Sequence, residues 1–369
     1  MTGEKYFLHA LAAFRPFISA LRLQELVQTT GSFEKAWQVE DSKLSELGWN
    51  EEQKQKFKEH RSSWRLERNF ELLSSYGISI ISFNDGTFPV SLKNIFDPPL
   101  ALYVRGTIEA DSFSIGFVGS RKATPYGKTA TNILVRPLAS RGITIVSGLA
   151  YGIDAEAHRA TLSVNGKTIA VLGNGIDEAT LYPRAHRDLA REIVDKGGAV
   201  ISEYPPATKP QGYFFPQRNR IISGLSKAIV VVEAGERSGA LITAKEALEQ
   251  NRDVFAVPGP ITSELSKGTN RLIKEGAAPI QSAEDLVESL ELADFLKPEV
   301  KQILPENHDK SLPKSDTDII LRILTREPLA IDEIVKRSTL SPNVVASCMT
   351  LLEMDNIVRD VGSKSYVKV

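Results

Sequence analysis

The stretch SIGFVGSRKATPYGKTATNILVRPLASRGITIVSGLAYGIDAEAHRATLSVNGKTIAVLG, residues 114–173, decides the fold. Its three apolar runs are rich in Val and Ile, and two segments with helical spacing, 126–140 and 153–162, separate them. Continuous apolar strands joined by helices of about 10–15 residues are typical of a parallel sheet that is covered on both faces. The sequence therefore predicts an α/β fold with a Rossmann-like, doubly wound parallel sheet.

The same alternation continues on the C-terminal side and changes character on the N-terminal side. Helices are predicted at 185–196 and 238–250, among the strand runs AVISEY, AIVVVEA and DVFAVPG. Residues 78–104 hold short β-rich runs with turn residues between them, which predict connecting or edge strands. Residues 4–75 carry apolar side chains at helical spacing, and we expect an all-helical module there.

The C-terminal part divides into a linker and a small domain. An acidic stretch with two prolines predicts a last helix followed by a linker at 291–315. Helix patterns at 316–324, 331–337 and 341–354 precede two short strand runs, which together form a winged-helix pattern. We therefore divide the chain into four parts: a helical module at 1–75, an extended Rossmann-like domain at 76–290, the linker at 291–315 and a winged helix at 316–369.

Composition narrows the class of protein. The chain has 369 residues, 42% of them hydrophobic and 25% charged, and one cysteine, Cys348. These values exclude disordered and collagen-like chains, a disulfide framework and a cysteine-based structural zinc site. No apolar run approaches the roughly 18 residues that span a bilayer, and the opening MTGEKYFLHA lacks a basic leader and an apolar core. We expect a cytoplasmic protein with no membrane contact.

The near-zero net charge hides a segregation along the chain. Overall, 45 Lys and Arg side chains oppose 46 Asp and Glu side chains, but residues 111–280 hold 21 basic and 16 acidic ones. Residues 281–310 hold 3 basic and 8 acidic side chains. Any nucleic-acid partner is therefore expected on the Rossmann-like domain.

The predicted strand ends carry glycines and basic side chains. In an open parallel sheet, ligands bind beyond the carboxyl ends of the strands, where the free amides of helix N-termini favour anions. Gly119 and Gly148 lie at two of these ends, and a tight turn is the alternative role for either glycine. Ser120 and Arg121 follow Gly119 directly, and a guanidinium there suits bidentate phosphate recognition.

Signatures of catalysis are weak. The chain has neither a G-x-G-x-x-G motif in its first loop nor a G-x-x-x-x-G-K-[ST] motif, which disfavours a dinucleotide or ATP cofactor. Asp154 and His158 share one predicted helix face and could form an acid–base pair or two metal ligands, but no third ligand is evident. A hydrogen-bonding role is the simpler interpretation for His158. We expect no catalytic residue, no cofactor and no metal.

A second basic segment, TKPQGYFFPQRNRIIS, occupies residues 208–223 and has no acidic side chain. Cations that track phosphates and rings that stack on unpaired bases suit a single-stranded nucleic acid. In an extended segment, Arg218 and Arg220 share one face and Asn219 lies opposite. The alternative is that the rings are core and that the arginines pair with Glu203 or Glu233.

The terminal domains suggest other roles. The third predicted helix of the winged helix, SPNVVASCMTLLEMD, contains no Lys or Arg, and Asn343 is its only candidate for reading a base. We therefore interpret this domain as an interaction or regulatory module rather than as a sequence-selective repressor. Packing or partner binding is the expected role of the N-terminal module, and direct DNA contact through a hairpin at Gly48 is the less favoured alternative.

A series of motifs resembles one family. In order, they are FVGSRKATPYG, VSGLAYGIDAEAH, TIAVLGNGID with LYP following, ISEYP, FPQRNRIISGLS, VVVEAGERSGALITA, and NRDVFAVPG followed by KGTNRLIKEGA. They resemble the bacterial DNA-processing protein A (DprA, also called Smf) family. The flanking segments also look like that family, with a helical module of the sterile-alpha-motif (SAM-like) type and a winged helix.

The resemblance implies a non-enzymatic protein that binds single-stranded DNA without sequence preference. It implies protection of DNA taken up in natural transformation, loading of the RecA recombinase, and single-strand-binding protein as a further candidate partner. The candidate DNA contacts, from the strand ends and the motifs together, are Gly119, Ser120, Arg121, Gly148, Arg184, Lys209, Phe215, Arg218, Asn219, Arg220, Ser238 and Gly239. A homodimer is also implied, and Leu272 and Ile273 are the candidates for its interface.

A nucleotide hydrolase is the competing hypothesis. The segment GERSGALITAKEA, residues 235–247, lies where Rossmann-like hydrolases of the lysine-decarboxylase-like (LOG) type have a glycine-rich phosphate loop. Glu203 and Glu233 end predicted strands in the same region and could serve such a site.

Overall fold

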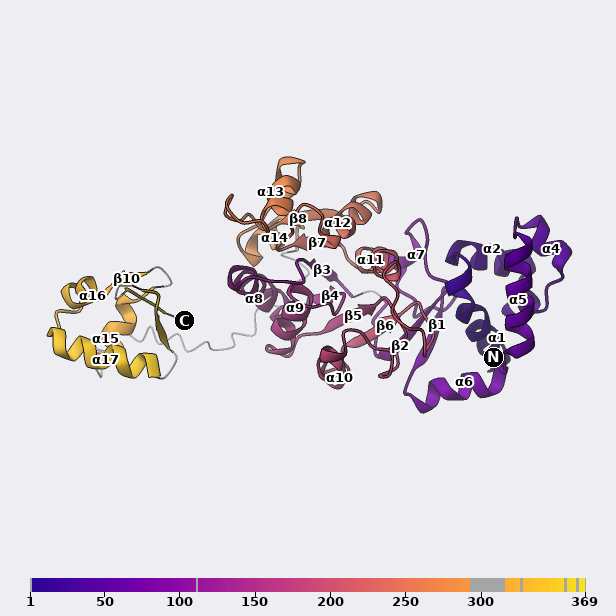
Figure 1. Ribbon diagram of the computed structural model, residues 1–369, viewed down its shortest axis with the longest axis horizontal. Coiled ribbons are helices and arrows are strands. Elements are labelled where there is room, and N and C mark those ends of the chain that lie inside the picture. Colours follow the sequence, from indigo (N-terminus) through magenta and orange to yellow (C-terminus); the bar gives the residue numbers. More distant parts are fainter. Residues whose placement is uncertain are drawn as a thin grey trace. The chain divides into compact units, whose positions relative to one another are not determined.

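The computed structural model describes residues 2–110, 112–292, 316–325, 328–354, 357–362 and 365–368. Its contacts divide the chain into two compact units, Met1–Val300 and Lys301–Val369. Each unit is described by itself (Figure 1). Most of the predicted linker, 293–315, lies outside the described residues.

The described part of the first unit contains a nine-stranded sheet with the order β1-β2-β6-β5-β4-β3-β7-β8-β9. The strands are β1 (Ser79–Ser82), β2 (Ala101–Gly106), β3 (Ser114–Val118), β4 (Thr144–Ser147), β5 (Thr168–Leu172), β6 (Ala199–Ser202), β7 (Ala228–Val231), β8 (Asp253–Ala256) and β9 (Ala278–Pro279). Strands β3 to β9 pair in parallel, whereas β2 pairs antiparallel with β6 and β1. The predicted edge strands therefore extend the main sheet.

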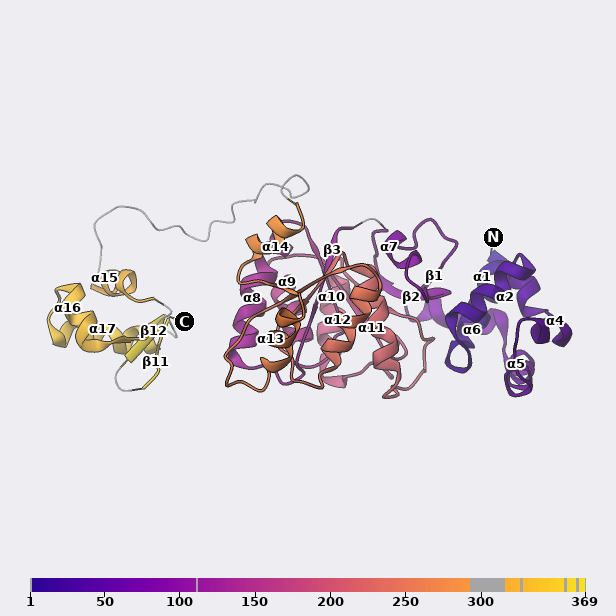
Figure 2. The ribbon, with the colours of Figure 1, turned by 90° about the horizontal axis from the view of Figure 1, so that it is seen from above.

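Helices cover both faces of this sheet, as the continuous Val and Ile runs predicted (Figure 2). One face packs against α8 (Pro125–Ser140), α9 (Ile153–Leu162), α10 (Arg187–Asp195) and α14 (Ala283–Ser289). The other packs against α7 (Val90–Lys93), α11 (Phe214–Leu225), α12 (Gly239–Glu249) and α13 (Lys267–Lys274). The α/β, doubly wound architecture is confirmed.

The N-terminal module is all-helical, as predicted, and packs on β1 and β2. Its helices are α1 (Thr2–Ala13), η1 (Arg15–Phe17), α2 (Ala20–Thr30), α3 (Phe33–Trp37), α4 (Asp41–Glu46), α5 (Glu51–Ser63) and α6 (Leu66–Ser75). Ser19 caps α2, and Asn50 with Gln53 forms a capping box at α5. His9 hydrogen-bonds to the hydroxyl of Tyr103 on β2 at 2.9 Å. One apolar cluster is therefore continuous from the module into the sheet.

The extended conformation considered for Arg218 to Arg220 was wrong, because these residues lie in α11, which begins at Phe214. Successive helical residues are about 100° apart, so Arg218 and Arg220 project toward different sides of α11 instead of sharing a face. Buried residues occur all around this helix, including Arg218, Asn219 and Arg220. The helix therefore lacks the one-sided apolar pattern by which a surface helix is recognised in sequence.

The second unit has the predicted winged-helix elements. They are α15 (Asp316–Ile323), β10 (Leu329–Ala330), α16 (Ile331–Ser338), α17 (Pro342–Met354), β11 (Val358–Asp360) and β12 (Ser365–Lys368). The strands form a sheet in the order β10-β12-β11, in which the short β10 was not predicted. Cys348 is buried in the core of this unit. Across the residues described in both units, no helix has the length and apolar character needed to cross a membrane.

Candidate nucleic-acid interface

A groove lies at the carboxyl ends of the parallel strands, where β3 has β4 on one side and β7 on the other. Its volume is about 460 Å³. The predicted residues that line it are Gly119, Ser120, Arg121, Phe215, Arg218, Asn219, Ser238 and Gly239. Gly148 lines an adjoining hollow together with Tyr151, Tyr182 and Arg121. The fold thus brings most of the predicted contacts together at the edge where open α/β sheets bind ligands.

Two adjacent residues in the loop after β3 have different roles: one is buried and structural, and the next is an exposed cation. Ser120 is buried; its amide donates to the carbonyl of Glu233 at 2.8 Å, and its own carbonyl accepts from the amide of Ile153 at 3.1 Å. The next side chain, Arg121, is exposed. Its guanidinium lies 5.5 Å from the ring centroid of Phe215, within the range of a cation–π contact. Arg121 is therefore placed to meet a ligand, whereas Ser120 fixes the turn.

Arg218 lines the groove but is almost fully buried, with 4% of its area exposed. Its Nη1 donates to the carbonyl of Val171 at 2.5 Å. Burial lowers the pKa of Arg218 to about 10, although the charge of Asp154 opposes that shift. Asp154 in turn accepts from the amides of Gly148 at 3.1 Å and Ala150 at 3.3 Å. Arg218 is thus a buried cation that joins α11 to the ends of β4 and β5.

Arg220 lies outside the groove lining. Its Nη2 is 2.7 Å from the carboxylate of Glu203, and its Nε is 3.2 Å from that of Asp97. This is the ion pair with Glu203 that the sequence left open as an alternative. Asn219, one residue earlier, does line the groove, and its side-chain amide is 3.5 Å from the carbonyl of Gly239.

Helix α12 begins at the groove, and Ser238 caps it. The Ser238 hydroxyl accepts from the amide of Ala240 at 3.3 Å, so it occupies one of the free donors of the helix N-terminus. Gly239 is exposed, and no atom lies within 4 Å of the position that its Cβ would occupy. Open space at Gly239 leaves room for a ligand to approach the backbone closely.

Exposed aromatic rings flank the groove, and sequence reasoning missed two of them. Tyr151 is 45% exposed and Tyr182 is 41% exposed, and both line the adjoining hollow. The ring of Tyr182 is 5.7 Å from that of the half-buried Phe215, and Tyr151 packs against His186. The signal was present in the sequence, since LAYG (149–152) and LYP (181–183) lie in the loops that follow β4 and β5.

Arg184 and Lys209 come from loops at the same edge of the sheet but do not line the groove. Arg184 begins η2 (Arg184–His186), two residues after Tyr182, and its side chain is exposed. Lys209 is exposed in the loop after β6, next to Thr208, whose carbonyl accepts from the amide of Gly175 at 2.8 Å. Both cations can extend a basic track beyond the groove.

The glutamates of the hydrolase hypothesis are engaged in structural contacts. Glu233 is 2% exposed, and its carboxylate accepts from the amide of Thr124 at 2.9 Å and from the hydroxyl of Thr124 at the start of α8. Glu203 is 3% exposed and lies between Arg220 and Arg15. Neither carboxylate lines the groove.

The residues considered for metal binding are also buried in structural roles. His158 hydrogen-bonds to the hydroxyl of Thr168 at 2.7 Å, and burial lowers its pKa to about 3. Among the residues that the structure describes, no group of three or more His, Cys, Asp or Glu side chains could hold a metal ion.

The predicted dimer residues Leu272 and Ile273 are half-buried on α13 and are not part of the groove lining.

Comparisons with known proteins show the family of this chain. Residues 79–291 match the family described as DNA recombination-mediator protein A, and residues 305–362 match the DprA winged helix domain. Protein Smf of Escherichia coli (strain K12) is 38% identical over 340 residues, which cover 90% of this chain and 89% of that protein. The DNA processing protein DprA of Bacillus subtilis (strain 168) is 44% identical over 228 residues, covering 61% of this chain and 76% of that protein.

Two solved structures are similar as well. The DNA processing protein A of Streptococcus pneumoniae has a TM-score of 0.65 and 32% identity, covering 78% of this chain and 97% of that one. The DNA processing protein A of Helicobacter pylori, described for its single-stranded DNA binding mode, has a TM-score of 0.53 and 29% identity and covers 59% of this chain and 97% of that one. The matching sequence motifs, the strand order and these relatives together show that the chain belongs to the DNA recombination-mediator protein A (DprA) family.

Proposed function

We propose that this protein binds single-stranded DNA along the groove, without sequence preference, and acts as a recombination mediator rather than as an enzyme. The observation that carries the proposal is the contact between the exposed Arg121 guanidinium and the ring of Phe215 at the mouth of the groove. A cation beside an accessible ring is what binding to an unpaired strand requires, because phosphates need charge and bases need a stacking surface. The single-strand binding mode described for the Helicobacter pylori relative supports this proposal.

The side chains divide into contact and support roles under this proposal. Arg121, Arg184 and Lys209 are exposed cations that contact phosphates. Phe215 and Tyr182 offer ring surface for stacking, which every base can use, so binding is tolerant of sequence. Arg218, Ser120 and Gly148 are buried and hold the wall of the groove and of the adjoining hollow in place.

The further steps of mediator activity belong to the same proposal. They are protection of incoming DNA in natural transformation, loading of RecA, contact with single-strand-binding protein, and dimerisation through the face of α13 that carries Leu272 and Ile273, all in the cytoplasm. A dimer would place the net positive charge of residues 111–280 of two copies side by side and so offer one strand a longer basic track.

One experiment separates the mediator from the hydrolase. The protein is mixed with a labelled oligothymidine to measure binding, and separately with nucleoside monophosphates to measure released base. Binding of the oligonucleotide with no released base is expected, because Glu203 and Glu233 are held by Arg220, Arg15 and Thr124. Release of base in proportion to protein, without binding to the oligonucleotide, would favour the hydrolase.

A further inference from the structure

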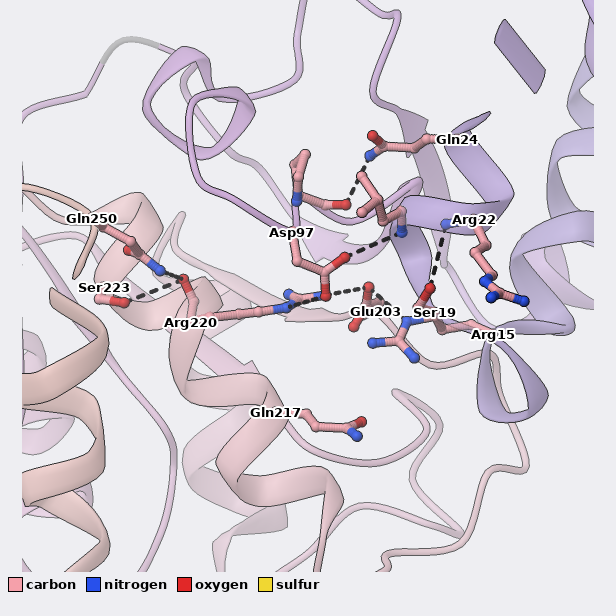
Figure 3. Close-up of polar contacts among 12 residues, drawn as sticks. Arg15, Ser19, Arg22, Gln24, Asp97, Glu203, Gln217, Arg220, Ser223 and Gln250 are labelled. Atoms are coloured by element: carbon pink, nitrogen blue, oxygen red, sulfur yellow. Dashed lines mark hydrogen bonds and ion pairs between the residues drawn. The ribbon is translucent and has the colours of Figure 1, made fainter. Parts of the chain in front are cut away.

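A network of four charged side chains, three of them buried and one 26% exposed, joins the helical module to α11 (Figure 3). The network consists of Arg15, Asp97, Glu203 and Arg220. One oxygen of Glu203 is 3.0 Å from Nε of Arg15 and 2.7 Å from Nη2 of Arg220. Asp97 holds the other side of Arg220 at 3.2 Å. The two guanidinia and two carboxylates balance in charge.

Most of the network is buried, which restricts the positions of its side chains. The side chains of Arg15 and Arg220 are each 9% exposed, and that of Glu203 is 3% exposed. Burial alone would raise the pKa of Glu203, but the charges of Arg220 and Arg15 outweigh it and the pKa is lowered. A buried ion network adds little net stability over an apolar core of the same shape, and removing one partner leaves a charge uncompensated. The main effect of the network is therefore to fix the positions of the elements that carry its residues.

The helical module holds the network at several points. Arg15 lies in η1, and its Nη1 donates to the carbonyl of Ile18 at 3.2 Å. The amide of Leu21, at the start of α2, donates to Asp97 at 3.1 Å. The side-chain amide of Gln24 donates to the carbonyl of Pro98 at 2.7 Å. The helical module thus bonds to the loop at 97–98 and, through the ion pair of Arg15 with Glu203, to the end of β6.

Helix α11 lies between this network and the groove. Phe215, Arg218 and Asn219 line the groove, whereas Arg220 enters the network. The carbonyl of Arg220 also accepts from the side chain of Gln250 at 3.1 Å. Because a short helix moves as one body, a constraint on Arg220 also sets where Phe215 lies, about one and a half turns earlier.

We propose that Arg15 is a positioning residue for the DNA groove: acting through Glu203 and Arg220, it lets the helical module fix α11 and so place Phe215 against Arg121. The proposal rests on the proposed function, since it concerns binding in the same groove. It assigns Arg220 an indirect role in binding, and it gives the N-terminal module a part in DNA affinity without any contact to DNA.

The test compares Arg15→Met with Arg22→Met in the full chain. Both substitutions remove one positive charge from the helical module, but among the described residues the Arg22 guanidinium bonds within that module, to the carbonyl of Gly48 and to Gln53. We expect Arg15→Met to weaken binding of oligothymidine about three- to tenfold, with an unchanged salt slope, because a network residue is lost but no phosphate contact. Arg22→Met is expected to bind like the wild type.

Tryptophan emission reports whether the module stays folded. All three tryptophans, Trp37, Trp49 and Trp64, lie in the helical module. If Arg15→Met unfolds it, the milder Arg15→Lys, which keeps the charge but lacks the guanidinium fork, replaces it in the comparison. Wild-type affinity in a folded Arg15 variant would overturn the proposal. So would equal losses in the Arg15 and Arg22 variants, or a salt slope reduced by about one. Failure of the wild type itself to bind would instead refute the proposed function.

Discussion

The guanidinium of Arg218 occupies the place where a side chain on residue 148 would begin. A Cβ built on Gly148 would lie 1.9 Å from Nη1 of Arg218. A Cβ on Gly173 would likewise lie 3.0 Å from the ring of Phe215. Because Gly148 and Gly173, at the ends of β4 and β5, have no side chain, α11 can pack closely against the sheet there. Their role is close packing beneath the groove, which is distinct from the phosphate-binding role of glycines in nucleotide loops.

Gly148→Ala should destabilise the protein by about 1–3 kcal/mol, because the added methyl group displaces the buried Arg218 guanidinium from the carbonyl of Val171. Denaturant unfolding measures this change. Gly239→Ala is the matched control, since no atom lies within 4 Å of its Cβ position, and its stability should stay within about 0.5 kcal/mol of the wild type. Equal stability of the two variants would show that Arg218 relaxes without cost.

Arg121→Ala should weaken single-strand binding alike for all sequences and lower the salt slope by about one, because one phosphate contact no longer releases a counterion. Arg191→Ala serves as the control. It removes the same charge from α10, where Arg191 pairs with Glu178 and Asp188 outside the groove lining. A salt slope unchanged in Arg121→Ala would remove this residue from the phosphate contacts.

Phe215→Leu should lose more affinity for single strands than for duplex, since only unpaired bases can stack on the ring. The expected loss on single strands is about 1–3 kcal/mol. Competition between labelled oligothymidine and unlabelled duplex measures both affinities. Tyr76→Leu, which removes an exposed ring at the end of α6, should leave both unchanged. Equal losses on the two substrates would contradict stacking.

Acid should destabilise the helical module through His9. Burial lowers its pKa from 6.5 to about 4, so below pH 6.5 the unfolded chain binds a proton that the folded module resists. The stabilising contribution, about 3 kcal/mol, is complete above pH 6.5 and is lost as the pH falls toward 4. His9→Phe should flatten this dependence in tryptophan-monitored unfolding, because Phe keeps the packing against Trp64 and Tyr103 without titrating. A pH profile identical to that of the wild type would exclude His9 as the source.

The sequence predicted the architecture well where burial follows a simple period. Uninterrupted apolar runs such as SIGFV identified the central strands, and α9 has the predicted ends at Ile153 and Leu162. Helix α11 was not predicted, because its polar side chains are buried against partners that are distant in sequence. Arg220, for example, pairs with Glu203 and Asp97. Such pairing leaves no trace in local periodicity.

The candidate site was predicted only in part, because contacts between residues distant in sequence decide which side chains are buried. Glycine and arginine at the end of β3 indicated the groove, and the structure brings Arg121 and Phe215 together there. Sequence could not distinguish a buried supporting cation, Arg218, from an exposed one. Nor could it show that Glu233 holds Thr124, the N-cap residue of α8, instead of facing a ligand, because that contact joins two loops far apart in the chain.

The central claim is that the groove binds unpaired strands, and a salt titration of the unmodified protein tests it most directly. Affinities for oligothymidine and for a duplex of the same length are measured from low to high salt. Binding to oligothymidine should be about tenfold tighter or more at each salt concentration, and both affinities should weaken as salt rises. Equal or tighter binding to the duplex, or no binding to oligothymidine at low salt, would contradict the account.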